Sequence, residues 1–413
     1  MLETDPLLQP RLRPVEAFPV RMNEQDFVCV RDPETLAEQP IFLNQSLLFL
    51  VSRMDGEHTL RDIQADYFRA TGEILPIETL ENLVTQLDEQ HYLDSPRFRA
   101  YYQELIASYR KAPTRPARHA GAAYENSYDA LVSQIHGYFD LPEGPGNNSI
   151  PDISKPLRGL IAPHIDFTRG GPTYAYAYAA LANSPTADIY IILGTCHTPM
   201  PQRFSVTNKD YETPLGTAKT DKKFIEQLLS RMGSQYLDEF SHRTEHSIEF
   251  QAVYLRYVLR NGRDFTIVPI LVNSFHDIYS DGRAAAEDRE ISKVVGAIRE
   301  TMKEAPGRIC VIAGADLAHV GRHFGDISGP TEQSLRQVER EDRIFLNLVE
   351  QGDAEGMFRS IAEDDDQRRV CGYPPIYMTL RCIDNPQGKL LQYRQWSDMN
   401  AGAAVTYAAL ALY

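Results

Sequence analysis

The second half of the chain contains Val311-Ile312-Ala313-Gly314-Ala315-Asp316-Leu317-Ala318-His319, an apolar run that ends in an aspartate and a histidine. A short continuous run of apolar residues is typical of a strand buried on both faces, as in a parallel sheet covered by helices. Side chains just beyond the carboxyl ends of such strands line the crevice in which α/β proteins bind ligands. The segment therefore predicts an α/β fold and places Asp316 and His319 at its functional edge.

Two further apolar runs also end in histidines. They are Leu160-Ile161-Ala162-Pro163-His164 and Ile191-Ile192-Leu193-Gly194-Thr195-Cys196-His197. Another histidine lies in Thr244-Glu245-His246-Ser247-Ile248-Glu249, and a cysteine begins Cys371-Gly372-Tyr373-Pro374-Pro375. Neutral imidazoles bind iron, copper, zinc and nickel, and a thiolate is a softer ligand. Convergence of these groups predicts a metal site; the alternative is that the histidines only form hydrogen bonds at strand ends and Cys371 is a small core residue.

The region from residue 121 to the C-terminus alternates strand and helix patterns. Such alternation predicts an α/β domain with a central, mainly parallel sheet flanked by helices on both faces. Strands are expected at 158–162, 188–193, 265–272, 308–313 and 389–396, with a final pair of strands within 401–412. Helices are expected at 128–139, 172–182, 221–232, 246–259, 289–303, 332–350 and 374–382. Gly170-Gly171-Pro172 is expected to open one helix, where its amides and Arg169 could hold an anion or form an ordinary tight turn.

The first 110 residues show a different pattern, which predicts a small α+β domain. An irregular segment at 1–20 precedes short strands at 27–30 and 40–43, and helical stripes follow at 47–54, 60–67 and 80–87. Thr59 is expected to cap the second helix, with Asp62 as its partner in a capping box. The segment 111–120 is rich in proline and basic residues, which predicts an exposed linker to a second domain at 121–413.

Composition restricts the class of protein. A chain of 413 residues with 43% hydrophobic residues is long enough for two domains with sizeable cores. The formal net charge of −15 argues against nucleic acid or an anionic membrane as a partner. The first residues lack the basic and apolar regions of a signal peptide, no apolar stretch approaches membrane-spanning length, and the five cysteines are scattered. These features predict a cytoplasmic protein with reduced thiols.

The histidine and cysteine motifs occur in the order typical of the Memo family, which in microbes is known as protein B of the AmmeMemoRadiSam system. The matching segments are Ala162-Pro163-His164, Gly194-Thr195-Cys196-His197, Glu245-His246-Ser247-Ile248-Glu249, Ala315-Asp316-Leu317-Ala318-His319 and Cys371-Gly372-Tyr373-Pro374-Pro375. Each motif is short, but five in order make the resemblance specific. It begins near Arg118-His119-Ala120-Gly121 and implies a fold similar to that of class III extradiol dioxygenases.

The resemblance implies a metal-binding set of residues. These are His164, His197 and Cys371, with Fe(II) or copper as the favoured metal and zinc as an alternative. Three protein ligands leave coordination positions for water, substrate or dioxygen. The extradiol relatives use two histidines and a carboxylate, so a thiolate in third place weakens any direct transfer of ring-cleavage activity.

The resemblance also implies a catalytic set in the same pocket. His246 and His319 are expected to serve as general acid or base. Asp316 and Glu249 are expected to orient imidazoles. His119 and the remaining histidines have no strand-end setting and are expected to be surface or structural residues.

Three positions depart from the family pattern. Asp166 follows the first motif in place of a glycine; it could join the metal shell, but an ion pair with Arg169 is expected. Cys196 stands directly before His197 and could be an extra ligand or a redox partner, but we expect it to pack. Tyr373 stands where relatives commonly carry arginine, which puts anion recognition there in doubt.

Residues 23–95 resemble the PqqD-like peptide-recognition fold, a small winged-helix-like unit. The resemblance rests on Met54-Asp55-Gly56-Glu57-His58-Thr59, followed by Ile63, Leu83, Leu87 and Tyr92-Leu93. In that family an edge strand and a neighbouring helix bind a leader peptide by strand addition. The alternative is a docked accessory domain without a ligand.

We therefore expect a metal-dependent oxidoreductase or dioxygenase-like enzyme of the Memo class. Its substrate is expected to be a peptide or a small aromatic molecule, and proteins of the radical-SAM system are candidate partners. One alternative is a non-catalytic iron- or copper-binding redox regulator. Another is a peptide-binding adaptor with a vestigial pocket.

Overall fold

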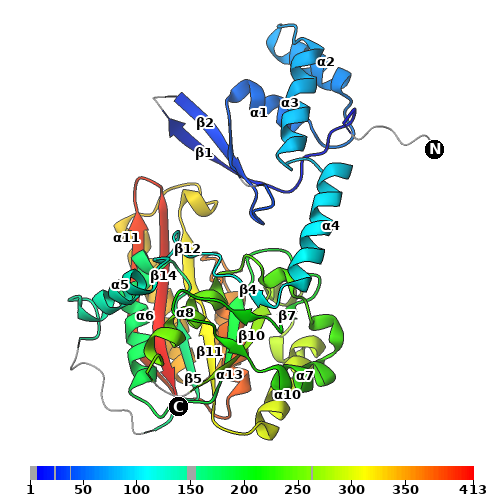
Figure 1. Cartoon of the computed structure of the whole chain (residues 1–413). Helices are drawn as coiled ribbons and strands as arrows, with labels where there is room; N and C mark the ends of the chain where they lie inside the picture. Colours follow the sequence, from blue (N-terminus) through cyan, green and yellow to red (C-terminus); the bar gives the residue numbers. More distant parts are fainter. Residues whose placement is uncertain (1–6, 23–24, 38, 147–154, 262–263) are drawn as a thin grey trace. The chain divides into compact units, whose positions relative to one another are not determined.

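The computed structural model describes residues 7–22, 25–37, 39–146, 155–261 and 264–413 (Figure 1). The chain divides into two compact units, Met1–Lys111 and Ala112–Tyr413. Each unit has a hydrophobic core of its own.

The first unit combines a small antiparallel sheet with helices. Strands β1 (Glu16–Met22), β2 (Gln25–Arg31) and β3 (Ile41–Leu43) pair in that order. Helices α1 (Gln45–Ser52), α2 (Leu60–Thr71), α3 (Ile77–Glu89) and α4 (Pro96–Lys111) follow. Thr59 and Asp62 form the expected capping box of α2. The expectation that residues 1–20 are irregular was wrong from Glu16 onward, because the prolines there conceal a strand that pairs with β2 along its whole length.

A mixed sheet forms the centre of the second unit. Its order is β12 (Asp316–Val320), β14 (Ala403–Leu412), β5 (Gly159–Ala162), β11 (Ile309–Gly314), β6 (Ile189–Thr195), β10 (Thr266–Val272) and β7 (Phe204–Val206). Strand β13 (Gly388–Asp398) also pairs with β14, and β9 (Lys219–Thr220) with β10. The pairs β5–β11, β11–β6, β6–β10 and β10–β9 are parallel, whereas the pairs made by β7, β12, β13 and β14 are antiparallel.

The description as mainly parallel therefore holds for the centre of the sheet and not for its margins. The expected pair of strands within 401–412 is one long strand, β14, which forms a hairpin with β13. A short connection between consecutive strands forces antiparallel pairing, because a parallel partner requires a crossover. Strand β12 was not expected, since Asp316 to His319 were interpreted as the loop that follows β11.

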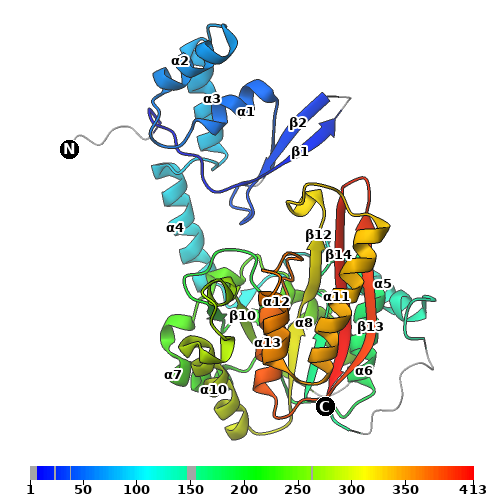
Figure 2. The same ribbon diagram turned by 180° about the vertical axis from the view of Figure 1, so that it is seen from behind.

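Helices cover both faces of this sheet (Figures 1 and 2). One face packs against α5 (Tyr128–Asp140), α6 (Phe167–Ala182) and α8 (Ser247–Val258). The other packs against α7 (Lys222–Met232), α10 (Arg289–Glu304), α11 (Glu332–Glu350), α12 (Ala354–Ala362) and α13 (Tyr373–Cys382). Successive residues of β6 point to opposite cores, Ile191 to one and Ile192 to the other. Burial on both faces explains why the strands are continuously apolar in sequence.

Helix α6 begins five residues earlier than expected. Asp166 is its N-cap and accepts a hydrogen bond from the amide of Arg169 at 3.1 Å. The amide of Gly170 already donates to the carbonyl of Asp166 at 2.9 Å, so it is part of the helix. The proposed anion site and the alternative tight turn at Gly170-Gly171-Pro172 are therefore both wrong, because Asp166 starts the helix before that segment.

The segment expected to be an exposed linker is partly buried in the second unit. Thr114–Arg115 form β4, which pairs with β8 (Asp210–Tyr211). The side chain of Arg115 is 0% exposed, and its Nη1 lies 2.5 Å from Glu249 Oε2. Its other donors bond to the carbonyls of His242 and Glu245, each at 2.6 Å. Proline and basic residues misled the prediction because the buried charge has a carboxylate partner more than one hundred residues away.

Arg115→Met is expected to lower the free energy of unfolding by about 3–5 kcal/mol, because it leaves the Glu249 carboxylate buried without its counter-charge. Guanidinium denaturation of the full-length protein measures the loss. The matched control is Arg336→Met, which removes an exposed ion pair with Glu332 and is expected to cost less than about 1 kcal/mol. Equal losses in the two variants would contradict the stabilising role of the buried pair.

Candidate metal centre

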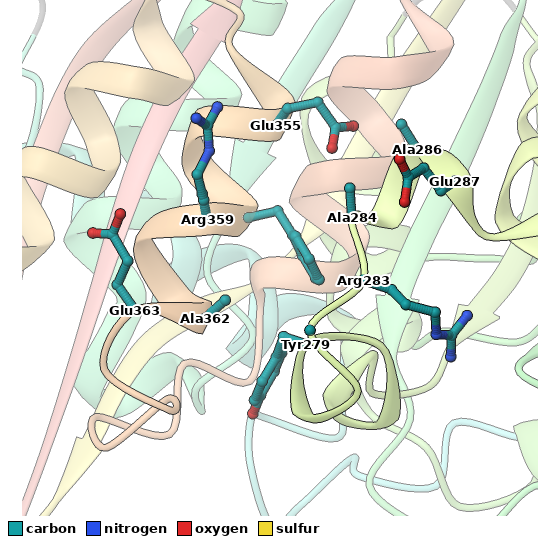
Figure 3. A pocket seen from close by; sticks show the side chains of 11 residues that line it. Tyr279, Arg283, Ala284, Ala286, Glu287, Glu355, Arg359, Ala362 and Glu363 are labelled. Atoms are coloured by element: carbon teal, nitrogen blue, oxygen red, sulfur yellow. The ribbon is translucent and has the colours of Figure 1, made fainter.

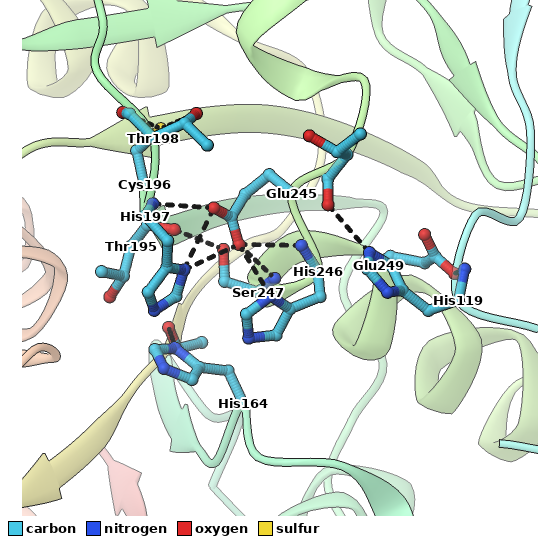
Figure 4. Close-up of polar contacts among 12 residues, drawn as sticks. His119, His164, Thr195, Cys196, His197, Thr198, Glu245, His246, Ser247 and Glu249 are labelled. Carbon is cyan, nitrogen blue, oxygen red and sulfur yellow. Dashed lines mark hydrogen bonds and ion pairs between the residues drawn. The ribbon is translucent and has the colours of Figure 1, made fainter. Parts of the chain in front are cut away.

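Three imidazoles meet at the carboxyl edge of the parallel strands (Figure 4). His164 follows β5, His197 follows β6, and His246 is the N-cap of α8. The ring centroid of His164 lies 5.0 Å from that of His197 and 5.3 Å from that of His246, and the centroids of His197 and His246 are 4.7 Å apart. Each ring offers one nitrogen, and these nitrogens all lie within 4.8 Å of one another, so the group could hold a metal ion.

The hydrogen bond of each Nδ1 determines which ring nitrogen is free. His164 Nδ1 donates to the carbonyl of Gly314 at 3.0 Å, which leaves Nε2 as an acceptor. His197 Nδ1 lies 3.1 Å from Glu245 Oε2, and His246 Nδ1 lies 3.3 Å from Glu245 Oε1. A carboxylate on Nδ1 fixes the tautomer and directs Nε2 away, as in many metal sites.

Glu245 is the carboxylate that the sequence reasoning missed. It is buried and accepts hydrogen bonds from the amides of His197 at 2.9 Å, His246 at 2.8 Å and Ser247 at 3.0 Å. Burial favours a higher pKa, but the neighbouring imidazoles and amides hold the pKa of Glu245 well below its usual value. The only sequence signal for this role is the position of Glu245 directly before His246, at the start of a helix.

Two of the three imidazoles, His164 and His246, are neutral before any metal binds. Burial, followed by the nearby His197, lowers the pKa of His164 to about 3. Burial also lowers the pKa of His246 well below its ordinary value. The lone pairs of these two imidazoles are therefore available at neutral pH. Burial, together with Asp316, raises the pKa of the Cys371 thiol well above its usual value.

Cys371 lies beside the imidazoles, just before α13. Its Sγ is 3.2 Å from His164 Nε2, the nitrogen that has no backbone partner. Two of the predicted metal ligands, His164 and His197, thus belong to the group of three imidazoles, and the third, Cys371, lies next to it. His246, which was predicted to be a catalytic residue, is the third imidazole of the group. The identity of the ligands remains a prediction.

Asp316 and His319 also lie next to His164. Asp316 Oδ1 accepts from the amide of His164 at 2.9 Å, and burial raises the pKa of this carboxyl to about 6. His319 Nδ1 donates to the carbonyls of Leu317 at 3.1 Å and Arg369 at 3.2 Å, which leaves its Nε2 as an acceptor. Burial lowers the pKa of His319, so this ring is neutral as well.

Glu249 lies in a different buried cluster. Its partners among the described residues are Arg115, the hydroxyl of Tyr124 and the amides of Arg118 and His119. Glu245, four residues earlier, occupies the place beside the imidazoles that was expected for Glu249. Of the two expectations for His119, a surface or a structural residue, the structural one fits: the residue is half-buried, its ring centroid lies 5.7 Å from that of His246, and its Nε2 donates to the carbonyl of Thr244.

The three departures from the family pattern have structural partners. Asp166 forms the expected ion pair with Arg169. Cys196 is buried and donates to the carbonyl of Thr198 at 3.2 Å. The hydroxyl of Tyr373 accepts from the amide of Phe275 at 3.0 Å, so it is used within the fold.

Two glycines allow α8 to approach the strand ends. A Cβ on Gly194 would lie 2.4 Å from Ser247 Oγ, and one on Gly314 would lie 2.5 Å from the carbonyl oxygen of Ser247. The Ser247 hydroxyl in turn donates to the carbonyl of Thr195 at 2.8 Å. This close contact brings His246, the preceding residue, to the two strand-end histidines.

With this geometry in place, similarity to known proteins is informative. The family profile described as Memo-like protein matches residues 115–411. The chain belongs to the Memo family. A MEMO1 family protein of Aquifex aeolicus is 29% identical over 392 residues, which cover 94% of this chain and 96% of the relative. A MEMO1 family protein of Methanothermobacter thermautotrophicus is 31% identical over 302 residues, which cover 72% of this chain and 99% of the relative.

The match with the Aquifex aeolicus relative is long enough to include most of both units, whereas the Memo profile begins at Arg115, within β4 of the second unit. Memo membership therefore applies to the unit that carries the imidazoles. In the described part of the chain, no helix combines the length and the apolarity that crossing a bilayer requires.

Gly314→Ala is expected to lower the free energy of unfolding by about 1–3 kcal/mol, because its methyl group would collide with the backbone of α8. The matched control is Gly296→Ala in α10, where an added Cβ meets no atom within 4 Å. That change is expected to stabilise the protein by about 0.5–1 kcal/mol. Thermal and chemical denaturation measure both effects, and a Gly314→Ala protein as stable as the control would refute the close approach.

Proposed function

We propose that this Memo family protein is a metal-dependent oxidoreductase or dioxygenase-like enzyme. The supporting observation is the set of His164, His197 and His246 nitrogens within 4.8 Å of one another. Imidazole nitrogens suit Fe(II), copper and zinc, and an adjoining thiolate favours the softer ions. We assign Fe(II) or copper as the metal, held by the three imidazoles with Cys371 as a fourth donor; such an ion would need to accept a fifth or sixth ligand to leave a position for substrate or dioxygen.

The separation of His164 Nε2 and Cys371 Sγ supports this ligand set. Metal–nitrogen and metal–sulfur bonds of about 2.0 and 2.3 Å would place two adjacent ligands of one ion roughly 3.0–3.5 Å apart. The separation of 3.2 Å lies in that range. Loss of the thiol proton and a small shift of either side chain would therefore suffice for both groups to bind one ion.

A bound ion would supply Lewis-acid or redox chemistry for an oxygen-containing substrate or dioxygen. The residues of the chain would do the rest. His319, neutral and with Nε2 unprotonated, is suited to accept a proton from the substrate. Asp316 holds the His164 segment through its amide, and Glu245 holds the rings of His197 and His246.

The substrate is proposed to be a peptide or a small aromatic molecule, handled in the cytoplasm. If the first unit is winged-helix-like and binds a leader peptide, this would favour a peptide as the substrate. Proteins of the radical-SAM system would then be the partners. A redox regulator that binds iron or copper without turnover uses the same ligands and differs only in lacking catalysis. Oxygen consumption by the Fe(II)-loaded protein with catechols and with candidate peptides separates the two functions.

The double variant His164→Ala/His197→Ala is expected to lose at least nine-tenths of the bound metal, because two of the imidazole ligands are removed. Elemental analysis of anaerobically purified protein measures the stoichiometry. His136→Ala, which removes an exposed imidazole on α5, is the matched control and should retain the metal. Full metal content in the double variant would refute the assignment of His164 and His197 as metal ligands.

At pH 7.5, binding of one metal ion is expected to release about one proton from the Cys371 thiol, which must ionise to become a ligand, whereas His164 and His246 are already neutral. Calorimetry in buffers with different ionisation enthalpies counts the protons. Cys371→Ser is expected to bind metal more weakly and to release about one proton fewer than the unmodified protein. Proton release that is unchanged in this variant would exclude the thiolate as a ligand.

A further inference from the structure

A separate cleft in the second unit lies between the segment that follows α9 (His276–Ser280) and helix α12 (Figure 3). Its volume is about 660 Å³, within the range of small-molecule sites. None of its lining residues belongs to the candidate metal centre. It therefore requires an explanation of its own.

The floor of the cleft is apolar. Tyr279 and Phe358 provide two aromatic rings whose centroids are 6.2 Å apart. Ala284, Ala286 and Ala362 line the walls with side chains too small to fill the space. Aromatic rings beside an open volume offer a large contact area to a flat or apolar body.

Charged side chains surround this floor in two groups. Arg283 and Glu355 are already paired, the first with Asp288 at 3.1 Å and the second with Arg381 at 2.8 Å. By contrast, the side chains of Arg359, Glu287 and Glu363 form no hydrogen bond or ion pair with any residue that the structure describes. Figure 3 shows Arg359 on α12, Glu363 directly after the end of this helix, and Glu287 on the opposite wall. A free cation and a free carboxylate thus face the cleft from two sides.

We propose that this cleft binds a small organic molecule with a carboxylate and an amine at opposite ends of an aromatic or other apolar body. The carboxylate pairs with Arg359 and the ammonium group with Glu287, while the body rests on Tyr279 and Phe358. Glu363 adds a second negative charge, which disfavours a ligand that carries a carboxylate alone. The proposal is independent of the metal centre, since no ligand of the metal contributes to it.

Three probes with the same ring and different charges test the proposal: 4-(aminomethyl)benzoate, benzylamine and benzoate. Calorimetry or ligand-detected NMR with the full-length protein gives their affinities. The amine–carboxylate probe is expected to bind most tightly, benzylamine less tightly and benzoate least. Equal affinities, or no saturable binding of any probe, would overturn the proposal.

Variants that remove one charge test which side chain of the cleft binds each end of the probe. Arg359→Gln is expected to weaken 4-(aminomethyl)benzoate roughly three- to fivefold and leave benzylamine unchanged, the effect of one partly exposed ion pair. Glu287→Gln is expected to weaken the first probe and benzylamine and leave benzoate unchanged. Arg336→Gln, an exposed change on α11, is the matched control. Ala284→Trp is expected to abolish binding by filling the cleft. If this variant fails to fold, the two charge variants still test the site, and unchanged affinities for 4-(aminomethyl)benzoate in both would refute it.

Discussion

The buried carboxylate of Glu245 is the contact on which the arrangement of the imidazoles depends. Its two oxygens contact two segments that are far apart in the chain: His197 after β6, through its amide and its ring, and the start of α8, through the amides of His246 and Ser247 and the ring of His246. A buried charge is tolerated only where it is fully hydrogen-bonded. One carboxylate therefore satisfies the helix N-terminus and fixes two ring orientations at once.

Most of the second unit could be predicted because its strands are buried on both faces. Continuous apolar runs located β5, β6, β10 and β11 to within a few residues, and the carboxyl ends of these strands do carry His164 and His197. The margins were harder to predict. Strand β12 follows β11 almost without a break. The turn with Asn400 and Gly402 that joins β13 to β14 was missed, because residues 401–412 were expected to form a pair of strands by themselves.

Part of the candidate site could be predicted and part could not, for a physical reason. Strand-end histidines are local features, whereas the choice between Glu245 and Glu249 depends on how the first turn of α8 faces the sheet. Glu245, just before the N-cap of the helix, points its carboxylate at the rings, whereas Glu249, one turn later, points at Arg115. The sequence had predicted that Arg115 lies in a solvent-exposed linker. Contacts between residues so far apart in the chain leave no periodic signal.

The burial of Arg115 determines where the second unit can be separated from the first. Because β4 pairs with β8 and the guanidinium holds Glu249 and the carbonyl of Glu245, the second unit includes its own first few residues. A fragment that starts at residue 121 would lack this cation and keep its buried acidic partner. A fragment meant for expression of the imidazole-bearing unit alone should therefore begin at Ala112, the first residue of that unit, or earlier.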